Sequence, residues 1–351
     1  MSGIDRNADR NFNLADLPLV SVLLPVRNGM PWLGAALDSV LAQTLAAIEI
    51  IVLEDGSTDG TPKFLATISD PRLRIVPTGG VGIARALNIG LSVASGKYIA
   101  RHDADDESLP TRFARQMAFL ETNPEIDIVA TAAEYIDSNG DIVSSAWVDT
   151  VRSQQDVALT AEEIGELMPL TCCITHGSIM ARRDLLRAHR YDSTMVPAED
   201  YDLWLRLLPQ HRFAKLSDRL YRHRLHQGQS GAQRREEQTR KAILAKLQYI
   251  RRVCPDLPPL ATLAIVGDTQ GDRFYREIAR SAGFQVIDDS DAWDVLAVTD
   301  FAAIDAQERA LCAPVESRRS GSARQTRASS EIDRIGNCFV SRPRRASQRI
   351  A

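Results

Sequence analysis

The segment YIARHDADDESLP, residues 98 to 110, runs from an apolar stretch directly into four acidic side chains. An apolar run that ends in turn residues is typical of a buried strand. Like charges a few ångströms apart repel, so the carboxylates either face open water or meet a cation. The rest of the sequence decides between these two interpretations. The four acids are Asp103, Asp105, Asp106 and Glu107.

The residues before this segment alternate between strand-like and helix-like patterns. Short apolar runs end in turn residues, and stretches with apolar residues at helical spacing follow them. This alternation predicts an α/β fold with a mostly parallel central sheet flanked by helices. The predicted strands span 19–26, 48–55, 73–78 and 97–106, and the predicted helices begin at about Pro31 and Thr61 and span 82–94.

Polar side chains follow several of these predicted strands. Arg27 and Asn28 come after the first strand, Asp55 ends the second, and Asp103 opens the acidic cluster after the fourth. In open α/β sheets, ligands bind outside the carboxyl ends of the strands. We therefore expect these side chains to share one crevice.

Size and charge limit the class of protein. The chain has 351 residues, enough for about two domains, and a net charge of −4, which gives no electrostatic case for nucleic acid as a partner. No stretch approaches the roughly 18 to 20 apolar residues of a membrane span. Residues 1–17 form a polar leader without the apolar core of a signal peptide. These features predict a cytoplasmic protein.

Seven ordered blocks of the sequence resemble family-2 glycosyltransferases. The resemblance covers residues 18–232 and implies a GT-A fold with a Rossmann-like sheet, a nucleotide-sugar donor and an inverting transfer to an acceptor hydroxyl. The blocks are SVLLPVRN (21–28), SVLAQT (39–44), EIIVLEDGSTDGT (49–61), GIARALNIGLSVASGKYIARHDADD (82–106), THGSIMARRDLL (175–186), PAEDYDLWLRL (197–207) and YRHRLHQGQS (221–230).

The resemblance implies a metal site in the acidic cluster. Asp103 and Asp105 match the D-x-D element of the family, so Asp105 is expected to bind Mn²⁺ or Mg²⁺, and Asp103 to contact the ribose or the metal. Asp106 would support this arrangement. A divalent cation stabilises a departing diphosphate, and carboxylate oxygens are its usual ligands.

The R-x-H element adds Arg224, expected to bind the diphosphate, and His226, expected to bind the metal or the diphosphate. Surface positions without a ligand are the alternative for both. Asp55 matches the aspartate that accepts the uracil N3 proton, because a carboxylate is an acceptor. The other residues expected on the donor side are Pro25, Arg27, Asn28 and Arg85.

The acceptor side is predicted around a second acidic pair. Asp200 matches the catalytic base of the family, and Glu199 would orient the site, since an acceptor hydroxyl needs a base at neutral pH. Asp202 is expected to be exposed or to cap the helix. His176 and Trp204 are candidate acceptor contacts, with a structural role as the alternative for the histidine.

Beyond residue 232 the resemblance fades. Residues 233–260 read as a charged helix and a proline-rich linker, and 261–312 as a small α/β module. Residues 313–351 form a basic tail too poor in apolar residues to order itself. The tail either attracts anionic lipid at the inner face of a membrane or is solvated without a partner, and the second interpretation is favoured.

Taken together, the sequence predicts a metal-dependent glycosyltransferase of surface polysaccharide synthesis that uses a UDP-sugar and a saccharide or lipid-linked saccharide acceptor. Two alternatives remain open. A nucleotidyltransferase that makes sugar nucleotides would use a similar sheet but would give the Glu199–Asp200 pair no role. A non-catalytic nucleotide-sugar binding module would be expected to lack Asp105 or Asp200.

Overall fold

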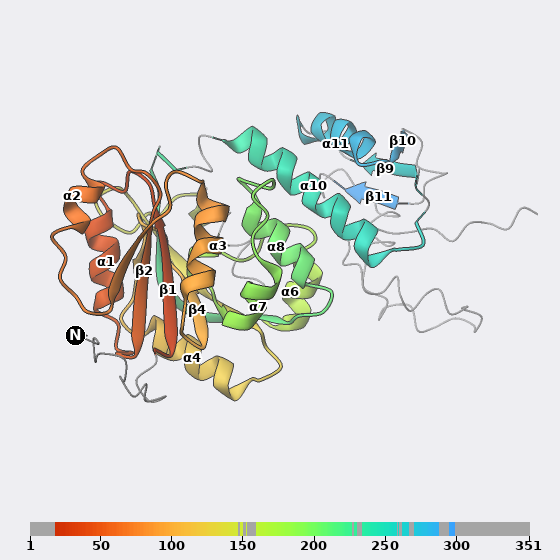
Figure 1. Ribbon diagram of the computed structural model, residues 1–351. Coiled ribbons are helices and arrows are strands. Elements are labelled where there is room, and N and C mark those ends of the chain that lie inside the picture. Colours follow the sequence, from red (N-terminus) through yellow and green to blue (C-terminus); the bar gives the residue numbers. More distant parts are fainter. Residues whose placement is uncertain are drawn as a thin grey trace, which may run out of the picture.

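The structure is a computed structural model (Figure 1). The predicted leader, residues 1–17, and the predicted basic tail, residues 313–351, lie outside the described residues. The described residues are 18–146, 148, 149, 152, 159–226, 228, 229, 234–257, 259, 262–266, 270–287 and 295–298.

Residues 20–101 form the predicted alternation of strands and helices. The fourth strand ends at Arg101, earlier than predicted, because the acidic residues after it form a turn. The elements are β1 (Val20–Val26), α1 (Leu33–Leu41), β2 (Ile48–Glu54), α2 (Thr61–Leu65), β3 (Leu73–Pro77), α3 (Ile83–Val93) and β4 (Tyr98–Arg101).

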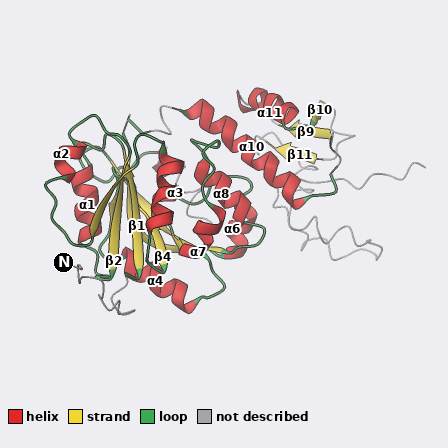
Figure 2. Cartoon of the chain, viewed as in Figure 1, coloured by secondary structure: helices red, strands yellow, loops and turns green. Residues whose placement is uncertain are grey.

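The described residues of the next part of the chain add four strands to the same sheet, together with four α-helices and one short 3-10 helix, which Figure 2 colours by type. They are β5 (Glu107–Ser108), α4 (Arg112–Thr122), β6 (Ile128–Ile136), α6 (Ala161–Leu167), the short helix η2 (His176–Ser178), β7 (Met180–Arg182), α7 (Arg183–His189), α8 (Glu199–Leu207) and β8 (Phe213–Arg224).

The strand order of this sheet is β3-β2-β1-β4-β7-β6-β8-β5. β1 pairs in parallel with β2 and β4, and β6 pairs in parallel with β8. β7 is antiparallel to both β4 and β6, and β5 is antiparallel to β8. Within this sheet β5 and β7 are therefore the reversed strands, and the carboxyl ends of β1, β2, β4, β6 and β8 meet at one edge.

Hydrophobic side chains fill both faces of the sheet. Along β1, Val20, Val22 and Leu24 pack with α1 and α4 on one face, whereas Leu23 packs with α3 on the other. This alternation follows from the period of two along a strand. Both faces are covered by helices, as parallel sheets require (Figure 1).

A long helix joins the sheet to the C-terminal elements. Ala245 and Tyr249 of α10 (Arg235–Val253) belong to the core beside α8, while Leu247 packs with Ile278 and Phe284. The C-terminal elements form a three-stranded parallel sheet in the order β10-β9-β11. They are β9 (Thr262–Val266), α11 (Gln270–Ser281), β10 (Gln285–Ile287) and β11 (Val295–Val298).

Of the helices in the described part of the chain, none combines the length and the apolar character needed to cross a membrane.

Gly96, between α3 and β4, offers a test of this packing. A Cβ atom there would lie 2.6 Å from the Ser21 nitrogen and 2.8 Å from the Val20 carbonyl carbon. Backbone atoms cannot move aside, so Gly96→Ala is expected to lower the free energy of unfolding by about 1–3 kcal/mol. Urea denaturation followed by circular dichroism measures this change.

Gly34→Ala is the matched control. A Cβ on Gly34 would meet its nearest neighbour, the Phe64 ring, at an ordinary 3.5 Å. The position is helical, so alanine is expected to stabilise the protein by up to about 1 kcal/mol. Equal unfolding midpoints for the two variants would contradict the packing described for Gly96.

Candidate active site

The carboxyl ends of five strands bring distant segments together at one edge of the sheet. Residues from all five meet there because their strands run in the same direction. The segments are residues 27–28 after β1, Asp55 after β2, 102–106 after β4, 137–138 after β6 and 225–226 after β8.

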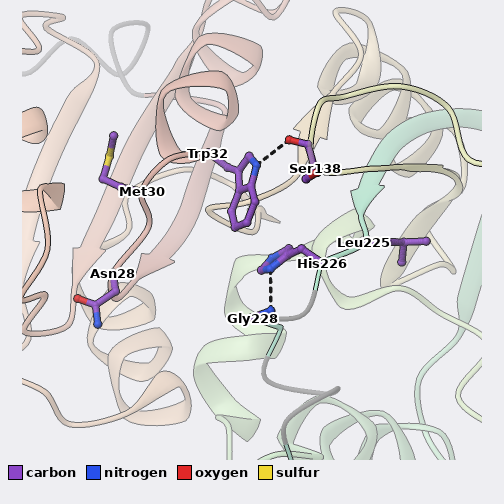
Figure 3. A pocket seen from close by; sticks show the side chains of 7 residues that line it. All are labelled: Asn28, Met30, Trp32, Ser138, Leu225, His226 and Gly228. Carbon is purple, nitrogen blue, oxygen red and sulfur yellow. Dashed lines mark hydrogen bonds between the residues drawn. The ribbon is translucent and has the colours of Figure 1, made fainter.

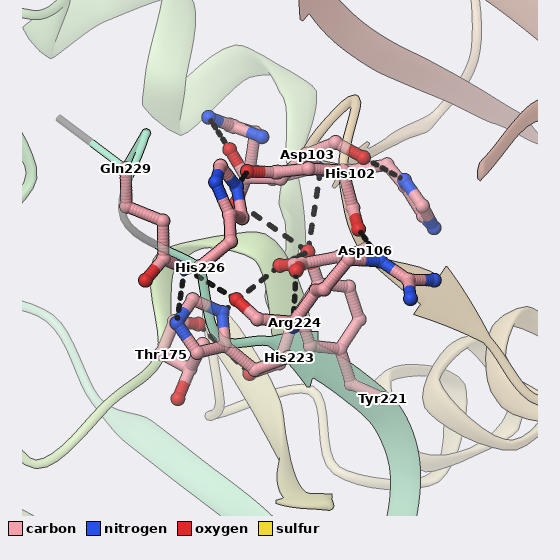
Figure 4. Close-up of polar contacts among 12 residues, drawn as sticks. His102, Asp103, Asp106, Thr175, Tyr221, His223, Arg224, His226 and Gln229 are labelled. Carbon is pink, nitrogen blue, oxygen red and sulfur yellow. Dashed lines mark hydrogen bonds and ion pairs between the residues drawn. The ribbon is translucent and has the colours of Figure 1, made fainter. Parts of the chain in front are cut away.

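The acidic turn after β4 is paired with the end of β8. The fully buried Asp106 carboxylate accepts hydrogen bonds from the Tyr221 hydroxyl (2.6 Å), His223 Nδ1 (3.0 Å) and the Arg224 backbone nitrogen (2.7 Å) (Figure 4). Burial alone lowers the pKa of His223, but the charge and hydrogen bond of Asp106, together with the charges of Asp103 and Asp105, outweigh it and raise the pKa to about 9. An ion pair between the buried Asp106 and the partly buried His223 thus holds the turn against the strand.

Asp105 has its own partner from the same strand end. Its Oδ2 lies 2.9 Å from His226 Nε2, and His226 Nδ1 accepts a hydrogen bond from the Gly228 nitrogen. An imidazole that accepts at Nδ1 carries its proton at Nε2 and donates it. In this arrangement His226 donates to Asp105, and its binding to a metal or a diphosphate stays a prediction.

The Arg224 side chain is buried within the protein, in contrast to the prediction. It is 3% exposed, and each of its three guanidinium nitrogens donates to a protein acceptor. The acceptors are the Asp105 carbonyl, the Asp137 carbonyl and the Glu107 carboxylate. The guanidinium ties three segments together, so the expected contact with a diphosphate is corrected to a structural role.

Asp103 is held from two sides. Its Oδ1 forms an ion pair with Arg101 Nη2 at 2.6 Å, and its Oδ2 lies 3.4 Å from the Tyr221 hydroxyl. A Cβ on Gly177 would come within 2.6 Å of the same Oδ2, so a glycine is needed beside it. Burial opposes ionisation of Asp103, but the charge and hydrogen bond of Arg101, together with the charges of His176 and His223, outweigh it and lower the pKa. Asp103 is thus ionised and fixed.

The acidic turn fits a divalent cation shared with a substrate. Burial, together with the charges of Asp106 and Asp103, raises the pKa of Asp105 to about 6, which marks a site with excess negative charge. Among the described residues, no three acidic, histidine or cysteine side chains gather as a complete metal site. Mg²⁺ commonly takes one or two protein carboxylates and completes its shell with phosphate and water. Asp105 fits that pattern.

The second acidic pair opens helix α8. Burial, with the charge of Asp200, raises the pKa of Glu199 to about 7. Burial also raises the pKa of Asp200, although the Tyr201 backbone nitrogen donates to its Oδ1 at 2.7 Å. The charges of Arg101 and Asp103 act on both groups. The pair is therefore close to the acidic turn and suited to holding a proton near neutral pH.

Two expectations for α8 are corrected. Asp202 is buried and forms an ion pair with Arg206 at 2.8 Å, so it is neither exposed nor a free cap. Trp204 is fully buried and packs edge-on against His176 and Phe213. The helical phase turns this ring into the core beneath the site, so it does not line an acceptor surface.

His176 lies between the core and the site. Its Nε2 lies 2.9 Å from the Tyr191 hydroxyl. Burial, with the Arg101 charge, lowers the pKa of His176 to about 3, so the ring is neutral. This arrangement corresponds to the structural alternative for the histidine.

Asp55 organises the loop between β3 and α3. Its buried carboxylate accepts hydrogen bonds from the Thr78 hydroxyl (2.6 Å), the Val81 nitrogen (2.8 Å) and the Gly82 nitrogen (2.8 Å). Burial alone would raise the pKa of Asp55, but these hydrogen bonds outweigh it and lower the pKa. Asp55 is thus an ionised acceptor, and in this structure its carboxylate oxygens accept hydrogen bonds from the loop.

The remaining donor-side candidates are spread along this edge. Pro25 is half-buried within β1, opposite Leu53, and Arg27 is exposed just after the strand. The Asn28 side-chain oxygen accepts a hydrogen bond from the Thr58 nitrogen at 2.8 Å. Arg85 is exposed on α3. These residues border the edge without direct contacts to the acidic turn.

A cavity of about 630 Å³ opens beside the acidic turn (Figure 3). Trp32 forms one wall, with its indole nitrogen donating to the Ser138 carbonyl at 3.0 Å and its ring 4.1 Å from the His226 ring. The lining residues are Asn28, Met30, Trp32, Ser138, Leu225, His226 and Gly228.

Sequence reasoning missed several residues of this site. Arg101 belongs to a strand, Tyr221 lies at the start of a predicted motif, and Trp32 begins a helical pattern, so each reads as ordinary packing. The one available signal for Arg101 was a charged residue at the end of an otherwise apolar strand. Gly177, beside the histidine that the sequence singled out, gave no signal.

Comparison with known proteins gives consistent matches. The family model "Glycosyl transferase family 2" matches residues 21–190. EpsE of Bacillus subtilis, whose name marks it as a glycosyltransferase, is 33% identical over 58% of this chain and 72% of its own length. The O-antigen biosynthesis glycosyltransferase WbnJ of Escherichia coli is 28% identical over 61% of this chain and 82% of its own length.

One solved structure shows the same fold. The crystal structure of S. aureus TarS 1–349 in complex with UDP-GlcNAc superimposes with a TM-score of 0.53 and 17% sequence identity. The match covers 74% of this chain and 71% of that one.

The Asp106 ion pair gives a stability prediction. Asp106→Asn removes a buried charge that faces the partly buried His223, and a buried group left without its partner costs about 1–3 kcal/mol. We expect a loss of that size in the free energy of unfolding, measured by urea denaturation. Asp38→Asn, at an exposed helical position, is the control and should change stability by less than about 0.5 kcal/mol. Similar losses in both variants would refute the anchoring role.

The raised pKa of Glu199 gives a pH prediction. The folded state holds this proton up to about pH 7, whereas the ordinary pKa is 4.5, so stability falls as pH rises between these values. Glu199→Gln cannot ionise and should be more stable than the wild type at pH 8, with a smaller difference at pH 5. Unfolding midpoints at both pH values measure this. Glu125→Gln, at an exposed position, should show no such dependence, and a Glu199→Gln variant less stable than the wild type at pH 8 would contradict the assignment.

Proposed function

Because the chain belongs to glycosyl transferase family 2, we propose that it moves a sugar from a UDP-linked donor to a hydroxyl of a saccharide or lipid-linked saccharide, with inversion at the anomeric carbon. The observation that carries this proposal is the closeness of the acidic turn to α8, which begins with Glu199 and Asp200. Trp204 of α8 packs against the His176 ring at 5.9 Å, and a Cβ on the adjacent Gly177 would lie 2.6 Å from the Asp103 carboxylate. The acidic turn suits a metal ion and a donor diphosphate, and Asp200 suits an acceptor hydroxyl.

The donor side consists of the acidic turn and the neighbouring strand ends. Asp55, Arg27 and Asn28 border the same edge, where a nucleotide would lie at the carboxyl ends of the strands. TarS, which has the same fold, binds UDP-GlcNAc, and this supports a UDP-sugar as the donor. Asp105 would hold a bound Mn²⁺ or Mg²⁺, which supplies positive charge to the departing diphosphate.

The acceptor side supplies a base. Burial makes Asp200 a stronger base than an exposed aspartate, so it can take the proton from an acceptor hydroxyl. The acceptor oxygen forms a bond to the anomeric carbon while the bond from that carbon to the diphosphate oxygen breaks. The electron pair leaves with the nucleoside diphosphate, and the proton stays on Asp200. A single displacement of this kind inverts the anomeric configuration.

The relatives support a role in the synthesis of surface polysaccharide. WbnJ is named for O-antigen biosynthesis, and this chain covers 82% of its length. The presence of both Asp105 and Asp200 disfavours a non-catalytic binding module. A nucleotidyltransferase would need no acceptor base and would leave the Glu199–Asp200 pair unused.

Release of nucleoside diphosphate from UDP-, GDP- and dTDP-sugars tests the proposal. We expect one UDP-sugar to be hydrolysed slowly in the presence of Mn²⁺ or Mg²⁺, and Asp105→Ala to lose this reaction. Asp200→Asn should lower transfer to an added acceptor by about 10²–10⁴-fold while it still binds the donor.

Asp184→Asn removes an exposed carboxylate from α7 and should behave like the wild type. Full activity of Asp200→Asn would rule out the assigned base. Calorimetry on the same donors separates the alternatives, because binding without turnover in the presence of varied acceptors would identify a binding module.

A further inference from the structure

Arg101, the last residue of β4, is a buried cation with unused hydrogen-bond donors. The residue is 2% exposed, and its Nη2 binds Asp103 at 2.6 Å. Its Nε and Nη1 are buried without a hydrogen-bond partner in the part of the chain that the structure describes. Arg101 therefore makes one strong contact, and that contact is to a carboxylate of the acidic turn.

A second buried arginine shows that this arrangement is unusual. Arg112 is also fully buried, but all of its nitrogens have partners: Gln116, Ser108, and the carbonyls of Arg101 and Ile179. A donor left unpaired inside a protein costs about 1–3 kcal/mol, so a retained one calls for an explanation. Arg112 has the contacts of a structural arginine, and Arg101 does not.

The surroundings of Arg101 contain acids on two sides. Asp103 is its direct partner. Burial raises the pKa values of Glu199 and Asp200 across the site, and the positive charge of Arg101 acts in the opposite direction on both. Other titratable groups around the guanidinium are His176, Tyr191, Tyr221 and the buried cation Arg112. Arg101 is thus a buried positive charge between the acidic turn and the acidic pair of α8.

The contact fixes one carboxylate and leaves the next one available. With Oδ1 on Arg101 and Oδ2 beside Tyr221 and Gly177, Asp103 can neither turn away nor act as an unpaired anion. Asp105 keeps a half-buried carboxylate whose partner is the histidine of the following loop.

We propose that Arg101 is a positioning residue that neutralises and orients Asp103. Of the carboxylates of Asp103 and Asp105, a divalent cation then meets only that of Asp105, whose partner is a histidine and not an arginine. This inference rests on the proposed function for the role of the cation. The ion pair reduces the affinity of the empty site for free metal and keeps the site for a cation that arrives with a diphosphate, whose own oxygens complete the shell.

Calorimetric titration of Mn²⁺ alone into the protein tests this inference without turnover. In Arg101→Met, Asp103 becomes unpaired and can bind the cation, so Mn²⁺ should bind about tenfold more tightly than in the wild type. An arginine that was only structural would leave Mn²⁺ binding unchanged or weaker on removal. Tighter binding therefore supports the proposal, and unchanged or weaker binding in a folded variant overturns it.

Two further variants separate charge from other effects. Arg101→Lys keeps the positive charge and should bind Mn²⁺ within about threefold of the wild type; binding as tight as in Arg101→Met would overturn the proposal. Arg74→Met removes an exposed cation from β3 and controls for net charge, so it should leave Mn²⁺ affinity unchanged.

The double variant Arg101→Met/Asp103→Asn keeps the test decisive if Arg101→Met does not fold, because it removes both charges of the ion pair. Since the pair as a whole is neutral, this double change should leave Mn²⁺ affinity within about threefold of the wild type. A tenfold loss would make Asp103 a metal ligand and overturn the proposal. Failure to turn over any nucleotide sugar would reject the proposed function, yet the Mn²⁺ titration would still decide the role of Arg101.

Discussion

The pairing of the acidic turn, residues 103–107, with the end of β8 is the interaction on which the site depends. A turn with four acidic side chains repels itself unless each has a partner. The strand end supplies partners for three of them through His226, His223 and Arg224, while Arg101 supplies the fourth from within the turn's own strand. Protein cations and donors therefore do much of the neutralising that water or a metal ion would otherwise provide.

The parallel part of the fold could be predicted because its signals are local. In β1, apolar residues and a following turn define the strand, and the alternation with helices defines the direction of the sheet. The reversed strands could not be predicted in the same way. β5 has two residues and β7 has three, too few for any periodicity, so pairing in the folded sheet decides their structure.

The position of the site could be predicted from the sequence, but many of the contacts within it could not. Strand ends in a parallel sheet converge by geometry, so Asp55 and Asp105 could be assigned to one edge from the sequence. Burial depends on what packs around each side chain, and spacing does not encode it. The sequence therefore assigned Arg224 and Trp204 to the correct region of the fold, but it did not predict that both side chains are buried. Arg101 was missed because a strand-end arginine has the same appearance in sequence whether it is solvated or buried.

The acidic turn and the end of β8 lie far apart along the chain, and this has a consequence for how the protein is synthesised. Asp106 and the Arg224 backbone nitrogen that donates to it are 118 positions apart. At about 5–20 residues per second, the ribosome needs roughly 6–24 s to synthesise the chain between them. During that interval the turn has left the ribosome without the strand that neutralises it. A nascent chain therefore lacks the paired acidic turn, which forms once β8 has joined the sheet.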